Sequence, residues 1–232
     1  LFPKRDSRPK TTTAFVADRI HRAHDGGDGQ RATLVRFALV VAEYADVVDD
    51  VVDDDVAPGR EAEALLVSQL LVPAMVRSAS RLGDRAVDYW TADAAALVQV
   101  PLVREPEATP SPDAYLELLD EQASLRSSIT GLAAVAAGAD DDAVERAERV
   151  GRAVHRLMQF STDLHQYGHD ADDDPWNAVA LLSEEAFLDA IDRFRADLAT
   201  AATYPDPYAR QITAIWDRDF RSRYREAVED AS

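Results

Sequence analysis

The sequence predicts an all-α protein folded as one helical bundle. Apolar residues recur at three- and four-residue spacing along most of the 232 residues, which is the periodicity of amphipathic helices. No segment combines the two-residue alternation of a strand with turn signals on both sides. Glycine and proline gather in a few short stretches that divide the chain into helices. We therefore expect a single domain over residues 1–232, with residues 1–12 flexible.

The spacing of apolar residues and breaks predicts eight helices in order. Gly26-Gly27 ends the first, Pro58-Gly59 ends the second, and Pro73 is expected to kink or break the third. The proline-rich segment 101–112 and the acidic segment 171–174 are expected loops. The predicted helices cover about residues 11–24, 31–55, 61–82, 85–100, 113–137, 141–168, 184–202 and 207–230.

The charge of the chain restricts its partners. The formal net charge is −18, the acidic residues are spread along the whole sequence, and lysine occurs only at Lys4 and Lys10. A polyanion would be repelled by most of this surface, so nucleic acid is not an expected partner. An acidic, lysine-poor composition is typical of proteins from salt-in halophiles, where high salt screens self-repulsion. We interpret the chain as haloarchaeal on this composition; the alternative is an ordinary acidic soluble protein.

The sequence also limits the chemistry and the compartment. It contains no cysteine, which excludes disulfides, cysteine-ligated zinc and thiol catalysis. No uninterrupted apolar stretch approaches the ~20 residues that a membrane span needs. The first residues contain no apolar region of the kind found in signal peptides. We therefore expect no transmembrane segment and a cytoplasmic location.

The end of the second predicted helix carries the strongest functional signal. Aspartates stand at positions 46, 49, 50, 53, 54 and 55. Asp49 and Asp53 are four residues apart and share one helix face with Asp46. Carboxylates at the C-terminal end of a helix repel one another and the negative end of the macrodipole, so they need a compensating cation. Oxygen ligands suit Mg²⁺, which also binds phosphate oxygens. The alternative interpretation is a solvated acidic helix end.

The residues from Val48 to Asp55 resemble the first aspartate-rich motif, DDxxD, of the trans-prenyltransferases, which belong to the class I isoprenoid synthase superfamily. Segments 97–99, 113–125, 131–140 and 151–163 resemble later motifs of that family, in the same order. The resemblance covers about residues 31–182. It implies the isoprenoid synthase fold around a central apolar cavity, two or three Mg²⁺ ions, an isoprenyl diphosphate substrate and a homodimer.

The chain departs from this family where the family binds isopentenyl diphosphate. The basic signature before the first motif is not present, and Arg60 is the only cation shortly after that motif. Glu121-Gln122 stands where the family has a Lys-Thr pair, and the second motif keeps one aspartate, Asp163. These departures put chain elongation in doubt.

The terpene synthases share the fold class but do not use isopentenyl diphosphate as a second substrate. Their NDxxSxxxE metal motif resembles the spacing of Thr162-Asp163, Gln166 and Asp170, and Arg223-Tyr224 resembles their diphosphate-binding pair. We therefore expect an Mg²⁺-dependent enzyme that ionises an allylic isoprenyl diphosphate and is more like a terpene synthase than a chain-elongating enzyme. The alternatives are a short-chain trans-prenyltransferase (a polyprenyl diphosphate synthase) and a non-catalytic partner subunit of one.

The resemblance implies a role for each candidate residue. For the Arg side chains at 126 and 156 the alternative is an ion pair with the abundant acids. For the apolar candidates the alternative is ordinary core. The expected catalytic residues are Asp49, Asp50, Asp53 and Asp163. The expected metal ligands are Asp49, Asp53, Asp163, Gln166 and Asp170. The expected diphosphate-binding residues are Arg126, Arg156, Arg223 and Tyr224. The expected pocket residues are Tyr44, Val48, Gln159 and Phe160.

Overall fold

The computed structural model describes residues 8–52, 56–92, 110–167, 175–202, 208–214, 216 and 219–230. Within these ranges the regular secondary structure is entirely helical, as the apolar periodicity predicts. The helices are α1 (Arg8–Ala23), α2 (Asp28–Val52), α3 (Glu61–Leu82), α4 (Asp84–Ala92), α6 (Pro112–Gln122), α7 (Ser124–Ala136), α8 (Asp141–Gln166), α9 (Ala178–Leu181), α10 (Glu184–Ala201), α11 (Tyr208–Ala214) and α12 (Phe220–Asp230).

The structure differs from the predicted helices in four places. The first helix, expected from about residue 11, begins at Arg8. The helix expected at 113–137 is divided at Ala123, which keeps right-handed helical backbone angles, so no glycine or proline signals the break. The helix expected at 207–230 is two helices, α11 and α12. The short α9 is capped by Asn177, whose side chain accepts from the backbone N–H of Val179, and four residues are too few to give a periodicity.

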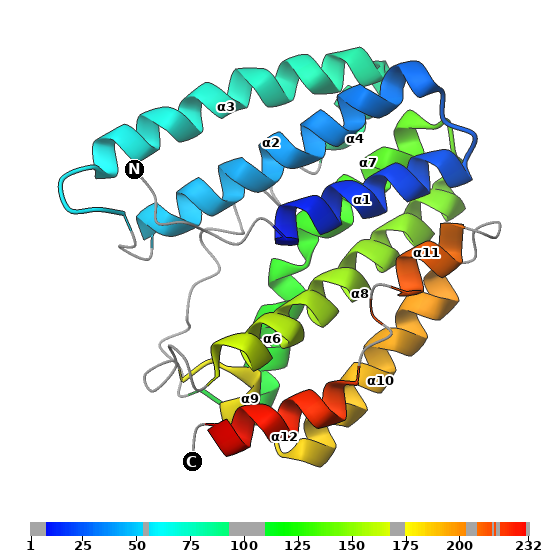
Figure 1. Ribbon diagram of the computed structural model, residues 1–232. Helices are drawn as coiled ribbons and strands as arrows, with labels where there is room; N and C mark the ends of the chain where they lie inside the picture. The colour runs from blue at the N-terminus through cyan, green and yellow to red at the C-terminus, as the bar shows by residue number, and fades with distance from the viewer. Residues whose placement is uncertain are drawn as a thin grey trace.

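Helix α3 continues through Pro73 and packs along α2 (Figure 1). Its inner side buries small residues, including Ala64, Ser68 and Ala79. It is the one described helix that is long and apolar enough to cross a membrane by length and composition, and 28% of the apolar window is buried. Its outer side exposes a set of aliphatic side chains, Leu65, Leu66, Leu70, Val72 and Val76.

Helix α8 is the centre of the bundle. It packs against α7 on one side and α10 on the other, and α7 in turn packs against α1, which packs against α2 (Figure 1). Its buried positions recur every three or four residues, as in Ala147, Val150, Val154 and Leu157. Each large apolar side chain buried in this way stabilises the fold by roughly 1.5–3 kcal/mol. The bundle core therefore lies on both sides of α8.

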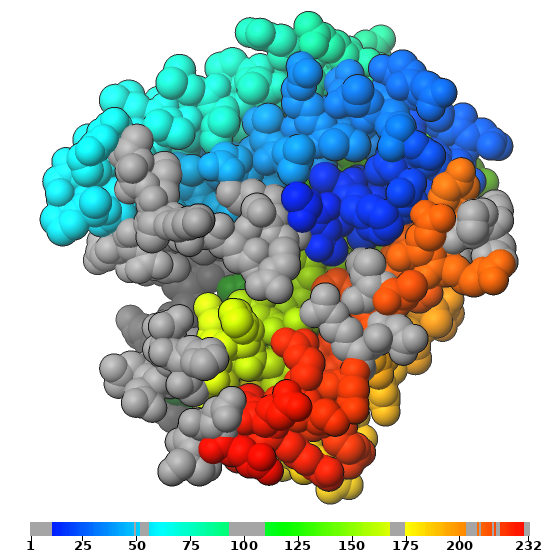
Figure 2. Space-filling model, viewed as in Figure 1, coloured from blue at the N-terminus to red at the C-terminus, as the bar shows by residue number. Residues whose placement is uncertain are grey.

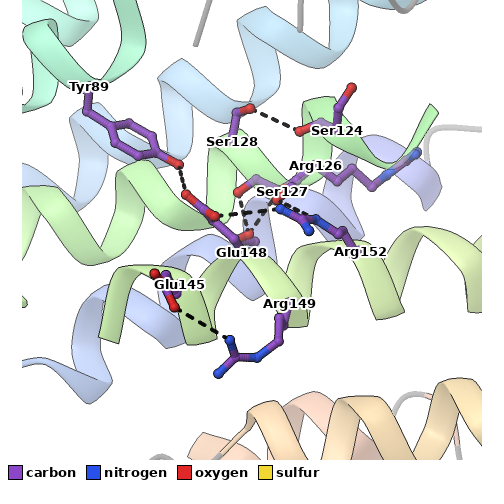
Figure 3. A network of polar contacts seen from close by, with 10 residues as sticks. Tyr89, Ser124, Arg126, Ser127, Ser128, Glu145, Glu148, Arg149 and Arg152 are labelled. Carbon is purple, nitrogen blue, oxygen red and sulfur yellow. Dashed lines mark hydrogen bonds and ion pairs between the residues drawn. The ribbon is translucent and has the colours of Figure 1, made fainter. Parts of the chain in front are cut away.

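Two glycines let α7 approach its neighbours closely. A Cβ atom on Gly151 of α8 would lie 2.6 Å from the carbonyl oxygen of Arg126 in α7. A Cβ atom on Gly131 of α7 would lie 2.0 Å from the hydroxyl of Tyr89 in α4. That hydroxyl donates to Glu148 Oε1 at 2.7 Å, which joins α4 to α8 beside α7 (Figure 3). The register between α7 and α8 is therefore fixed by steric fit as well as by polar contacts.

Helices α2 and α8 end on the same side of the molecule, at the left in Figure 1. In the space-filling view the cyan start of α3, which follows α2 in the chain, and the yellow-green end of α8 both lie on this side (Figure 2). The bundle thus brings the C-terminal ends of two helices distant in sequence to the same side of the molecule.

Candidate active site

The C-terminal end of α2 is held against the start of α3 by a small apolar cluster of Val47, Val56 and Ala64, with Val51 packed on it. This anchor fixes the part of α2 that carries the aspartates. Asp50 is buried, with 1% of its surface exposed. Asp49 lies within α2, but its side chain is outside what the structure describes, as is all of Asp53. The positions of these two carboxylates therefore remain a prediction.

The donor set of this motif fits magnesium by its chemistry. It offers carboxylate oxygens without sulfur, at the negative end of a helix macrodipole. In the part of the chain that the structure describes, no three acidic or histidine side chains are already gathered to hold a metal. Asp49, Asp53 and the substrate diphosphate would together supply the oxygens, and Asp163 was expected to supply another from α8.

Asp163 occupies a different kind of environment from the one we expected. It is 2% exposed, and its Oδ2 accepts from the hydroxyl of Tyr115 at 2.7 Å and from the backbone N–H of Ala178 at 2.8 Å. Its Oδ1 accepts from Gln159 Nε2 at 2.8 Å. The side chain of Asn177 donates to the Asp163 carbonyl oxygen at 3.0 Å. This carboxylate therefore holds α6 and α9 against the end of α8.

The other expected ligands of the second motif do not form a described site. Gln166 is exposed at the last position of α8, and Asp170 lies outside the described residues. The interpretation of this segment as a facing metal site therefore finds no geometric support in the described part of the chain. The single aspartate that the sequence retains, Asp163, is explained by its three hydrogen bonds.

Two of the expected diphosphate-binding residues contact other groups. Arg156 donates to Asp120 Oδ1 of α6 at 2.6 Å and to Asp197 Oδ2 of α10 at 3.3 Å, and it lies over the ring of Phe194. It therefore matches the alternative of an ion pair with acids. Tyr224 is buried and donates its hydroxyl to the carbonyl oxygen of Leu182 at 2.8 Å. Burial raises the pKa of the Tyr224 hydroxyl, because the charged phenolate is disfavoured away from water.

Arg223 and Tyr224 point to different neighbours, although they are adjacent in sequence. Arg223 donates to Ser161 Oγ at 3.1 Å, which places its guanidinium against the last turns of α8. Of the expected pair, Arg223 is therefore the one that contacts α8, and Tyr224 belongs to the core with Phe187.

The expected pocket residues divide between two sides of the bundle. Phe160 is fully buried against Phe187 and Phe194, whose ring centroids lie at 4.7 and 5.3 Å, so it faces α10 and not α2. The side-chain amide of Gln159 donates a hydrogen bond to Asp163. Tyr44 and Val48 lie on α2 and are half-buried, with Tyr44 packed against the main core. These two remain candidates for a cavity wall, and Phe160 is ordinary core.

The side chain of Arg126 interacts with groups from three other helices. From α7, its Nε donates to Thr13 Oγ1 of α1 at 3.2 Å, and its Nη1 contacts Nδ1 of His155 in α8. Asp46 of α2 is the acid that acts on it electrostatically. Burial lowers the Arg126 pKa to about 10, and Asp46 partly offsets this effect. We call Thr13, Asp46, Arg126 and His155 the interhelical polar cluster.

Sequence reasoning missed His155. It is 6% exposed, and its pKa is held well below the ordinary value by burial, by Arg126 and by Arg156, so it is neutral. The only signal in the sequence was its place on the apolar face of α8, four residues after Gly151. A histidine on such a face is ordinarily core, and the partner on α7 is invisible without the fold.

The comparisons with known proteins concern the fold. No protein-family model matches the chain, and no curated protein matches it. Similar solved structures do exist. A geranyltranstransferase from Methanosarcina mazei has a TM-score of 0.67 and 17% identity, over 91% of this chain and 83% of that one. A geranylgeranyl pyrophosphate synthase from Corynebacterium glutamicum has a TM-score of 0.61 and 17% identity, over 95% and 80%.

A decaprenyl diphosphate synthase from Rhodobacter capsulatus is also similar, with a TM-score of 0.56 and 18% identity, over 95% of this chain and 84% of that one. The likeness extends over nearly the whole chain in each case. The predicted fold class is thereby confirmed: this chain has the all-α isoprenoid synthase fold.

Proposed function

We propose that the chain is an Mg²⁺-dependent prenyltransferase that binds an allylic isoprenyl diphosphate and transfers its isoprenyl group, as short-chain prenyl diphosphate synthases do. The observation that carries this proposal is the aspartate-rich sequence at the end of α2, on the side of the bundle where α8 also ends, in a fold similar to that of three prenyl-transferring enzymes. This is the alternative named above, and it fits the comparisons better than the terpene-synthase-like interpretation that we favoured from sequence.

The position of each candidate residue would determine its role in the reaction. Asp49 and Asp53 would hold magnesium, which when bound neutralises the charge that develops on the leaving diphosphate. Asp50, buried beside them, would orient the motif. Arg223, which lies against α8 at Ser161, would meet the diphosphate from the side of α8.

The second motif would have a structural role in this function. Asp163 positions the end of α8 and the start of α9 through its hydrogen bonds, and so fixes the end of α8 that lies on the same side of the molecule as the end of α2. We do not assign it a metal. The apolar tail of the substrate would enter the bundle between α2 and α8, since a hydrocarbon avoids the charged rim and water.

The experiment is a product assay with the purified full chain, Mg²⁺ and radiolabelled isopentenyl diphosphate. Dimethylallyl, geranyl or farnesyl diphosphate is added as the allylic substrate, and each is also supplied without isopentenyl diphosphate. Longer diphosphates formed with both substrates support the proposal. Hydrocarbon or alcohol released without isopentenyl diphosphate would restore the terpene-synthase interpretation. Binding without turnover would identify a non-catalytic partner subunit.

A further inference from the structure

The outer side of α3, at the upper edge of the bundle in Figure 1, carries an apolar stripe that is exposed to solvent. The residues of this α3 stripe, which are between 40% and 73% exposed, are Leu65, Leu66, Leu70, Val72 and Val76. They follow two neighbouring ridges of the helix, 65-69-72-76 and 66-70-73-77, whose spacing of four, three and four suits packing against another helix. A contiguous exposed apolar surface marks an interaction site.

Charged residues on the same two ridges are sorted by sign at the two ends of the stripe. Glu61 and Glu63, the acidic pair, precede it, and Arg77 and Arg81, the basic pair, follow it. All four side chains are exposed. Within the described ranges neither arginine of the basic pair forms an ion pair, although the chain has a net charge of −18. The basic pair is therefore available to acids from outside its own chain.

This stripe is complementary to itself when two copies of α3 lie antiparallel. A twofold axis at Leu70, its most exposed residue, would place Leu65 of one copy against Val76 of the other. The same register brings Glu61 opposite Arg81 of the partner subunit, because the midpoint of each pair lies within residues 70–71. A parallel arrangement would bring acid against acid, which is unfavourable. Apolar and charged residues thus favour one and the same register.

The start of α3 lies against the aspartate-rich end of α2. Ala64 is buried in the apolar cluster with Val47 and Val56, which places the acidic pair beside the last turns of α2. At 1.5 Å per residue, Arg77 lies about 24 Å and Arg81 about 30 Å from Glu61 along the same helix. A chain cannot bring its own basic pair to this end of the molecule, whereas an antiparallel partner does.

The aspartate-rich end of α2 has few cations of its own. Six aspartates stand within residues 46–55, and Arg60 is the only cation shortly after them. The guanidinium of Arg60 already donates to the carboxylate of Glu63. A diphosphate would bring further negative charge to this end, so its binding is favoured by each cation that a neighbouring chain adds.

We propose that Arg77 and Arg81 of a second copy of this chain add the positive charge that the diphosphate site at the end of α2 lacks, through antiparallel pairing along the α3 stripe. The pairing rests on α3 alone, and its effect on diphosphate binding rests on the proposed function. The stripe commits to a second copy, because a lipid surface would not explain why acid and base are sorted to its opposite ends.

The first test measures the association of the full chain by sedimentation equilibrium. Leu70→Glu puts two like charges at the axis and should raise the dimer dissociation constant about thirtyfold or more, the scale of an interface hot spot. Since Leu70 is 73% exposed, its replacement does not disturb the core. Val228→Glu makes a similar change at a residue of α12 that is 37% exposed, and should leave the constant unchanged. A monomeric wild type, whether or not it binds phosphatidylcholine vesicles, would overturn the pairing.

Charge reversal tests the register. Glu61→Arg and Arg81→Glu should each weaken the dimer about tenfold, and the double variant should recover to within about threefold of wild type. Recovery is diagnostic because the two positions are about 30 Å apart within one chain and meet only across the axis. A double variant as weak as the single ones would overturn the antiparallel arrangement.

Mg²⁺-dependent binding of inorganic pyrophosphate tests the contribution to the site. At protein concentrations where the dimer persists, Arg77→Gln with Arg81→Gln should lower the affinity about threefold to tenfold. The same replacements in monomeric Leu70→Glu protein should change nothing, because the basic pair is then far from the site. Equal losses in dimer and monomer would overturn the role of the partner subunit. No pyrophosphate binding by wild type would overturn the proposed function and this role together, while sedimentation still decides the pairing.

Discussion

The ends of α2 and α8 lie on the same side of the bundle, and each carries aspartate, yet the two are built differently. At the end of α8, Asp163 is enclosed and accepts three hydrogen bonds from Tyr115, Gln159 and Ala178. At the end of α2, six aspartates stand within ten residues, and one arginine follows shortly after them. A carboxylate with protein donors stabilises a fold, and closely spaced carboxylates at the C-terminal end of a helix repel one another unless a cation is bound. The same residue type therefore indicates structure on α8, and on α2 it supports the proposed ligand site.

The largest expected effect is the loss of activity when an aspartate at the C-terminal end of α2 is replaced. Asp53→Asn should lower Mg²⁺-dependent kcat by about a hundredfold or more, because one oxygen ligand and one negative charge are lost. The unfolding midpoint without Mg²⁺ should stay equal or rise, since like charges repel there. Steady-state kinetics and thermal denaturation check both. A variant with wild-type kcat would show that the α2 end is a solvated acidic segment.

The opposite result is expected at the α8 end. Asp163→Ala should lower the free energy of unfolding by about 2–5 kcal/mol, because it leaves the Tyr115 hydroxyl and the Ala178 N–H buried without an acceptor. Chemical denaturation measures this change. A stable Asp163→Ala protein that had lost Mg²⁺-dependent turnover would reverse the assignment and return Asp163 to the metal site.

A smaller effect concerns the pH dependence of stability. The pKa of His155 is lowered in the folded protein, so below the unfolded value of 6.5 the unfolded chain binds a proton that the folded chain does not. Stability attributable to His155 is therefore present above pH 6.5 and lost as the pH falls, by up to about 1.4 kcal/mol per pH unit. His155→Leu should flatten the curve of unfolding free energy between about pH 5 and 7. Curves of equal slope would contradict the buried, neutral state.

The smallest effect tests whether Tyr224 meets the substrate or belongs to the core. Tyr224→Phe removes the hydrogen bond to the Leu182 carbonyl oxygen and should cost about 1 kcal/mol of stability. The KM for the allylic diphosphate should not change, whereas Arg223→Gln should raise it. Equal increases in KM for both variants would restore the Arg223-Tyr224 pair as a diphosphate site.

The sequence predicts the fold better than the site, for physical reasons. Helices can be predicted from the local periodicity of apolar residues, and the structure contains α2, α3, α8 and α10 close to where the sequence predicts them. The break at Ala123 was not predicted, because no glycine or proline stands there. The terpene-synthase interpretation depended on reading Asp163 and Tyr224 as ligands from spacing, although their hydrogen-bond partners, Ala178 and Leu182, lie 15 and 42 residues away in the sequence. The contact between Arg126 and His155 joins positions 29 apart, which spacing along one helix does not reveal.

The close approach at Gly151 has a consequence for how this bundle could change. Since no side chain fits there, α7 and α8 cannot slide past one another by a fraction of a turn without a clash. One helical turn is about 5.4 Å. A shift of one helix along the other would therefore also require a residue without a side chain at the new point of contact.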